Sequence, residues 1–167
     1  MKTVTLTVVT KVVHNEADYA AVPAIITKLS GGGYFELGND IVSATGSITL
    51  VPLTTTNPFS GTFDGCGYVI DGLTGFSGNY GFVGKELTAT GVIKNIGFTN
   101  VVHTDGCASM LVMTDAGTLQ NIYIDYAATG TKSRRKFKFL DFLLQSNQSK
   151  LKLIPLFCGL PLLSRNA

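Results

Sequence analysis

Two aspartates in one short stretch are the residues of this chain that could do acid–base chemistry. Asp64 and Asp71 both lie in the segment PFSGTFDGCGYVIDGL, which begins at Pro58, and glycoside cleavage needs a pair of carboxylates. Asp64 stands in the pattern Phe-Asp-Gly-x-Gly, however, and Asp71 directly precedes Gly72. Aspartates in such turns commonly accept hydrogen bonds from nearby backbone N–H groups. The sequence therefore favours structural aspartates and predicts no catalytic residue.

The histidines are weaker candidates. His14 and His103 have no evident catalytic partners. The pattern His103-x-Asp105-x-Cys107 would place three side chains on one side of a strand, which is a weak sign of a metal or thiol site. An ordinary strand edge is favoured, because an active thiolate needs a positioned base. We therefore expect neither a metal nor a cofactor.

The three cysteines have a spacing typical of neither a disulfide framework nor a metal site. They are Cys66, Cys107 and Cys158. A disulfide between Cys66 and Cys107 is conceivable, but free buried thiols are the favoured interpretation.

Aromatic side chains suggest another kind of chemistry, which is contact with sugars. The middle of the chain carries Tyr34, Phe59, Phe63, Tyr68, Phe76, Tyr80 and Phe82. Strand alternation predicts that Phe59 and Phe63 point inward, which leaves Tyr68 and Tyr80 as the candidate exposed pair for a glycan. Core packing of all these rings is the competing interpretation, and it is favoured.

Short strands and sharp turns would have to position these residues. In the stretch from residue 59 to residue 73, glycines alternate with apolar residues every few positions. Glycine supplies the unusual φ/ψ angles of corners, and apolar residues supply the buried side of strands. Of the 167 residues, 45% are hydrophobic and 14% charged, so the chain can bury a core. The pattern predicts an all-β solenoid.

An internal repeat supports stacked coils. GVIKNIGF, which begins at Gly91, and GTLQNIYI, which begins at Gly117, share the pattern Gly-x-aliphatic-x-Asn-Ile. Stacking these segments would place aliphatic side chains on one another and would set Asn121 against Asn95 in a structural ladder of amide hydrogen bonds.

A third, weaker copy of the repeat extends the prediction by one coil. Ile70 and Leu73 are expected to lie in register with Ile93 and Ile96, at a slightly shorter offset. A period of this length also suits a leucine-rich repeat, but the Leu-x-x-Leu-x-Leu signature is missing. A parallel β-helix is therefore preferred.

Residues 1–33 are predicted to cover the first coil. Residues 2–13 alternate polar with apolar side chains and read as a strand. Asn15 can cap a short helix that runs to about Leu29 and ends at the glycines 31–33. Pro23 lies inside that span, so the helix begins there or comes in two pieces. A helix at this place would shield the open apolar end and the unpaired strand edges of a solenoid.

The middle of the chain resembles a known family. The segments that carry the resemblance are YFELGNDI (34–41), Pro52, FSGTFDGCGYVI (59–70), GFVG (81–84) and GVIKNIGF (91–98). In this order they resemble the right-handed parallel β-helices with GLUG-type repeats, which occur in bacterial surface proteins and in phage fibre or tailspike-like proteins. The resemblance covers residues 15–128 and implies a short right-handed parallel β-helix. Cys66 stands where that family commonly has Asn.

The composition changes abruptly after Thr131. Residues 1–131 carry five Lys or Arg against ten Asp or Glu, whereas residues 132–167 carry eight against one. The change separates the predicted coils, residues 34–131, from a basic Leu-rich tail, residues 132–167. The tail is a cap, a docking segment or a frame-shifted end.

The tail itself contains two patterns. Phe137, Leu140 and Leu144 would share one face of an amphipathic helix. The basic cluster 134–136 could attract phosphates without specificity, but no nucleic-acid-binding module accompanies it, so no specific nucleic acid is expected.

The resemblance implies a non-enzymatic structural or adhesive module. Such a module would be a virion surface or fibre component, or a bacterial surface adhesin fragment, that engages glycans or neighbouring subunits. A polysaccharide lyase or hydrolase that acts along a β-helix groove is the alternative. So few coils depend on their neighbours for stability, which favours self-association, and fibre-like β-helices are usually homotrimers.

The expected location is extracellular, on a virion or on a cell surface. The first residues form no recognisable signal peptide. The apolar run from residue 151 to residue 163 is too short to span a bilayer, so no transmembrane segment is expected.

Overall fold

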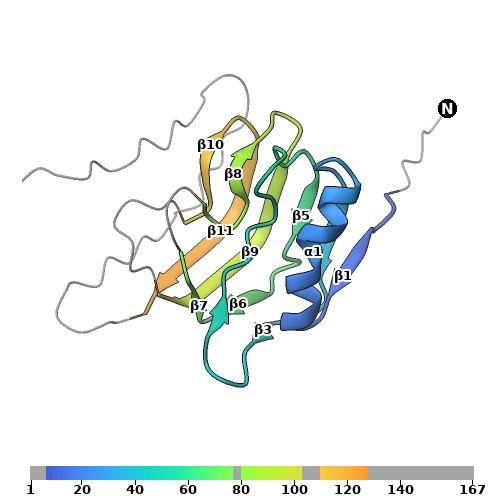
Figure 1. Ribbon diagram of the computed structural model, residues 1–167. Helices are drawn as coiled ribbons and strands as arrows, with labels where there is room; N and C mark the ends of the chain where they lie inside the picture. The colour runs from blue at the N-terminus through green and yellow to red at the C-terminus, as the bar shows by residue number, and fades with distance from the viewer. Residues whose placement is uncertain (1–6, 77–79, 103–109, 128–167) are drawn as a thin grey trace, which may run out of the picture.

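The computed structural model describes residues 7–76, 80–102 and 110–127, which form mostly parallel β-strands and one helix (Figure 1). The strands form a main sheet of seven and two sheets of two. Every strand pairing in this part of the chain is parallel. The expectation of a β-rich fold is thus confirmed at this coarser level.

The N-terminal helix forms where the sequence predicted it, but the strand is shorter than the predicted residues 2–13. Residues 7–10 form no strand, because the partner strand begins only at Tyr34, and residues 2–6 lie outside the described residues. Strand β1 spans Lys11–Val13 and helix α1 spans Glu16–Lys28. The side chain of Asn15 accepts a hydrogen bond from the N–H of Asp18, which confirms the predicted N-cap. Pro23 lies within a single continuous helix, so a start at Pro23 or a split into two pieces was wrong.

The main sheet stacks strands that are distant in the sequence. Its members besides β1 are β2 (Tyr34–Leu37), β3 (Ile41–Val42), β5 (Thr62–Asp64), β6 (Val69–Asp71), β9 (Val92–Val101) and β11 (Thr118–Tyr126). The first half of β9 pairs with β5 and its second half with β6, so this strand joins two stacks. Figure 1 shows β1, β5, β9 and β11 in succession, with α1 beside β1 at one end.

Two smaller sheets repeat the same parallel stacking. Strand β4 (Ile48–Thr49) pairs with β7 (Leu73–Thr74), and β8 (Gly84–Leu87) pairs with β10 (Val112–Asp115). Single bridges join Thr54 to Gly84 and Phe59 to Leu87. These contacts are all parallel, like those of the main sheet.

The observed register confirms one predicted alignment and corrects another. Leu119 pairs with Ile93 and Ile122 with Ile96, as the repeat predicted. Ile70, however, pairs with Phe98 rather than with Ile93. The corner between β5 and β6 holds residues 65–68, whereas only residues 95 and 96 occupy the same place in β9. The sequence prediction assumed one constant offset between repeat copies. The longer corner before Ile70 changes that offset, so the predicted partner of Ile70 was wrong.

A column of glycines borders the main sheet. Gly33, Gly61, Gly91 and Gly117 each lie one residue before a stacked strand. The carbonyl oxygens of the first three accept hydrogen bonds from the strands above them, at 2.8 to 2.9 Å. A Cβ atom on Gly61 would collide with the carbonyl oxygen of Gly33, and one on Gly117 would lie 2.5 Å from that of Gly91. The column thus sets how closely successive strands approach.

Aromatic rings fill the centre of the molecule. Phe59 and Phe63 are fully buried, which confirms that they point inward. Phe82 packs edge-on against Phe63 and Phe98, with ring centroids 5.3 and 4.9 Å apart, and stacks on Tyr19 of α1 at 6.1 Å. The core therefore extends from the helix to β9 without a break.

Candidate functional site

Outward-facing side chains form rows that cross the main sheet. The parallel register sets Glu36, Asp64, Lys94 and Gln120 next to one another on β2, β5, β9 and β11. Tyr34 stands in the adjoining row. Asp64, Lys94 and Tyr34 form the most densely connected polar cluster of this surface.

Asp64 is the centre of that cluster. One carboxylate oxygen, Oδ2, lies 2.9 Å from Nζ of Lys94 and accepts a hydrogen bond from the hydroxyl of Tyr34 at 3.3 Å. The other, Oδ1, accepts from the backbone N–H of Cys66 at 2.9 Å and from the side-chain amide of Asn95 at 3.0 Å. Both oxygens are thus occupied by donors of the chain itself.

These contacts decide the charge state of the cluster. Burial of Asp64 opposes its ionisation, but its bonds with Lys94, Cys66 and Asn95 outweigh burial and hold its pKa below the ordinary value of 3.8. The hydrogen bond with Asp64 raises the pKa of Lys94 above its ordinary value of 10.5. Both groups are therefore charged near neutral pH, and neither is tuned for proton transfer there. The arrangement suits a structural ion pair.

Cys66 lies at the corner beside this cluster. Its φ of 51° is in the left-handed region, and its side chain is a free, exposed thiol. The expectation of a buried thiol is therefore wrong for Cys66, because the corner turns its side chain outward. Desolvation, followed by the charges of Asp64 and Glu36, raises the pKa of this thiol above 9.0, so it is not an activated nucleophile. Cys107 and Cys158 lie outside the described residues.

Two stacked asparagines continue the polar network to the last strand. Asn95 and Asn121 both adopt a positive φ, 51° and 50°, a conformation that Asn tolerates better than most residues. The side-chain amide of Asn121 donates to Oδ1 of Asn95 at 2.9 Å. Since Asn95 donates in turn to Asp64, one chain of hydrogen bonds links β5, β9 and β11.

The second candidate carboxylate is likewise engaged. Oδ1 of Asp71 accepts from the hydroxyl of Thr99 at 2.5 Å and from the side-chain amide of Asn100 at 2.7 Å. These donors come from β9, whereas the sequence suggested local turn N–H groups. Asp71 therefore joins β6 to β9, as Asp64 joins β5 to β9.

The exposed aromatic residues form a different set from the one predicted. Tyr68, at the corner before β6, is exposed, whereas Tyr80, on the connection between β7 and β8, is half-buried. On the outer side of the main sheet, Val69, Gly97 and Tyr123 are paired neighbours on three strands. Tyr123 is 47% exposed. We name Tyr68, Val69, Gly97 and Tyr123 the tyrosine surface.

Gly97 gives this surface its shape. A Cβ at this position would lie 2.7 Å from Cγ1 of Val69 and 3.9 Å from Cδ1 of Tyr123. The two flanking side chains therefore lean over the glycine. Tyr123 was missed in the sequence, although the repeat GVIKNIGF and GTLQNIYI already set it opposite Gly97. A change from glycine to an aromatic residue at an outward position was the available signal.

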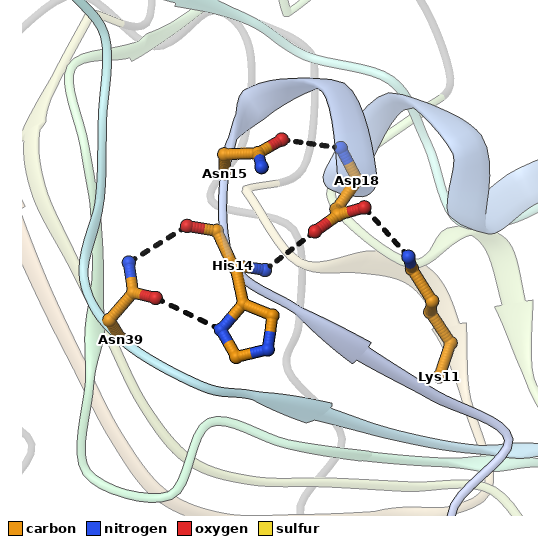
Figure 2. A network of polar contacts seen from close by, with 5 residues as sticks. All are labelled: Lys11, His14, Asn15, Asp18 and Asn39. Carbon is orange, nitrogen blue, oxygen red and sulfur yellow. Dashed lines mark hydrogen bonds and ion pairs between the residues drawn. The ribbon is translucent and has the colours of Figure 1, made fainter.

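His14 belongs to a separate network at the start of α1 (Figure 2). Its Nδ1 lies 3.2 Å from Oδ1 of Asn39, whose amide donates to the carbonyl of His14 at 2.8 Å. The N–H of His14 donates to Asp18, which also forms an ion pair with Lys11 at 2.7 Å. The network ties α1 and β1 to the corner after β2, which is a structural role.

The remaining sequence candidates fall into two groups. Within residues 7–76, 80–102 and 110–127, no cluster of three or more His, Cys, Asp or Glu side chains could hold a metal ion. The pattern from His103 to Cys107 and the whole tail, with its predicted helix, lie outside those ranges. No helix in the described part of the chain is both long and apolar enough to cross a membrane.

No protein-family model, curated protein or solved structure matches the chain.

Proposed function

We propose that the chain is a short right-handed parallel β-helix that serves as a non-enzymatic structural or adhesive module. The parallel pairing of strands supports this proposal. Paired residues lie 28 positions apart in the sequence between β2 and β5, 30 between β5 and β9, and 26 between β9 and β11. Successive coils of such length would return each strand to the same stack. Connections between parallel strands are almost always right-handed.

One contrast on the outer surface carries the functional part of the proposal. Asp64 and Asp71, the two carboxylates that could have served acid–base catalysis, are each held by donors from a neighbouring strand. Tyr68 and Tyr123 of the same sheet face remain exposed, and their side chains are not engaged in any such contact between strands that the structure describes. Fixed carboxylates with exposed aromatic rings favour binding over bond cleavage.

The tyrosine surface has the chemistry of a sugar contact. An aromatic ring offers an apolar face and a hydroxyl that can hydrogen-bond, which matches the mixed character of a sugar ring. Asn121 is exposed on the same strand as Tyr123 and provides amide groups for sugar hydroxyls. The ligand class that fits is a surface glycan.

We further propose that the module acts outside the cell, on a virion or a cell surface, and that it associates with itself as a homotrimer or with neighbouring subunits. Light scattering on the whole chain tests the assembly. A trimer mass is expected, and a monomer at all concentrations would contradict self-association.

Glycan binding is tested on an array of immobilised polysaccharides and cell-surface glycans. The intact chain is expected to bind a subset of them, and Tyr68→Ala and Tyr123→Ala are each expected to weaken that binding at least tenfold. Tyr80→Ala is the matched control, because it removes a tyrosine outside the tyrosine surface. Equal losses in all three variants would refute the assignment, and release of shorter sugars from a bound polysaccharide would favour an enzyme.

A further inference from the structure

Within the residues that the structure describes, the core is covered by a helix at one end and by no such element at the other. At the first end, α1 buries Tyr19, Val22 and Ile26 in the core. The hydroxyl of Tyr19 also donates to the carbonyl of Val51 at 2.7 Å. In the described residues, no comparable element lies beyond β11 (Figure 1).

The inward side chains of β11 show the consequence. Ile93, Ile96 and Phe98 on β9 are almost completely buried. Their stacked partners on β11 are Leu119, Ile122 and Ile124. These three aliphatic residues are only half-buried, although they pack against the same core. Aliphatic side chains that are only half-buried at inward positions indicate a surface that another segment covers.

The backbone of β11 points to the same surface. Within the described residues β11 pairs with β9 alone, so the outer edge of its residues 118–125 offers N–H and C=O groups for a further partner. Proteins rarely leave such an edge uncovered. We call this edge, together with Leu119, Ile122 and Ile124, the open end.

We propose that residues 128–167 of the same chain cover the open end. This segment continues directly from β11 and is longer than the 24 to 30 positions that separate paired strands. It is rich in leucine and phenylalanine, which suits an aliphatic surface. The proposal goes beyond the proposed function, since it concerns how the fold is completed and not what the fold binds.

Charge favours this occupant over a second copy of the chain. Strands β10 and β11 and their connection, residues 112–127, contain Asp115 and Asp125 and neither Lys nor Arg. Residues 132–167 carry eight Lys or Arg against one Asp, so their charge complements that of the open end. Two copies that met through this end would instead bring like charges together.

Photochemical cross-linking of the full chain tests which segment lies there. The photoreactive residue p-benzoylphenylalanine replaces Leu119 in one variant and Ile122 in another, because either substitution alone could disturb folding. Val42, which is exposed on the outer side of β3, is the control position. After irradiation at low protein concentration, mass spectrometry identifies the joined peptides.

The expected product has the mass of a single chain and joins position 119 or 122 to a peptide from residues 128–167, whereas position 42 gives no such product. Products with the mass of two chains, increasing with concentration, would overturn the proposal in favour of a second copy. Absence of any protein cross-link at both inward positions would also overturn it. Hydrogen exchange on the unmodified chain gives an independent reading: β11 amides that do not bond to β9 should exchange slowly, and rapid exchange would argue against a cover.

Discussion

At the scale of single residues, the polar side chains of the outer surface join strands rather than form a reactive centre. Asp64 receives donors from β2, from its own corner and from β9. Asn95 extends these contacts to β11 through Asn121. A residue with several partners on different strands contributes to stability through each of them.

Asn95 allows the contribution of its backbone and that of its side chain to be separated. Asn95→Gly keeps the positive φ without strain and loses the amide contacts, which should lower the free energy of unfolding by about 1 to 2 kcal/mol. Asn95→Ala should cost about 1 kcal/mol more, because alanine is strained at positive φ. Urea unfolding of both variants measures the difference. Equal stability of the two would show that the left-handed corner carries no strain.

The ion pair of Asp64 and Lys94 predicts a loss of stability in acid. The pKa of Asp64 is lower in the folded chain than its ordinary value of 3.8, so the stability that it provides is complete above that value. This stability is lost as the pH falls below 3.8 and through the lower folded pKa. Urea midpoints measured from about pH 7 to about pH 3 should fall more steeply for the natural chain than for Asp64→Asn.

A matched variant identifies the source of that acid dependence. The pKa of Asp18 is also lowered, first by its hydrogen bond with Lys11 and then by the N–H of His14. Asp64→Asn should therefore reduce the slope of the urea midpoint against pH without abolishing it. Asp18→Asn is the control variant. The part of the acid dependence of stability that comes from Asp64 should remain in it. Identical slopes in the natural chain and Asp64→Asn would contradict the assigned role of the ion pair.

At the scale of elements, the close approach of backbones at the glycine column sets the stacking of the strands. Gly33, Gly61 and Gly91 each offer a carbonyl to the next strand, and no room remains for a side chain at Gly61. This explains why glycine recurs at nearly constant intervals, although a glycine by itself disfavours a strand.

Gly61→Ala is therefore expected to be severely destabilising, by about 3 kcal/mol or more, because the carbonyl of Gly33 would have to move. Gly67→Ala is the matched control. Gly67 adopts a positive φ, 88°, but its Cβ would meet no atom within 4 Å, so only a conformational cost of about 1 kcal/mol is expected. Thermal unfolding followed by circular dichroism compares the two. Similar losses of stability in the two variants would mean that the contact between Gly61 and the carbonyl of Gly33 does not restrict the side chain at this position.

At the scale of the whole molecule, one core connects the helix to the strands. Phe82 contacts rings from α1, β5 and β9. It lies next to β8, and its backbone N–H also donates to the carbonyl of Met110 at 2.9 Å. Phe82 therefore couples the packing of helix α1 to the packing of the strands.

Phe82→Ala should lower the free energy of unfolding by about 3 to 5 kcal/mol and should loosen α1 together with the strands. Hydrogen exchange across the chain measures this, with protection expected to fall both in α1 and in β5. Phe82→Leu, which keeps most of the apolar volume, should lose much less. A loss of protection confined to α1 would show that the helix and the strands are independent units.

The sequence predicted those features that depend on neighbouring residues. Asn15 as N-cap, the inward direction of Phe59 and Phe63 and the pairing of residue 93 with residue 119 all follow from local spacing, and the structure confirms them. The fold class was predicted as an all-β solenoid from alternation and glycine spacing, which are local patterns; the structure confirms its coarser part, a β-rich fold of parallel strands.

The meeting of distant side chains depended on the three-dimensional arrangement. The pairing of Ile70 with Phe98 and the donors from β9 to Asp71 both vary with the length of each corner. A longer corner moves every later side chain of its strand to a different neighbour. Local patterns in the chain therefore set where strands and turns form, and the stacking of unequal corners decided which residues share a surface.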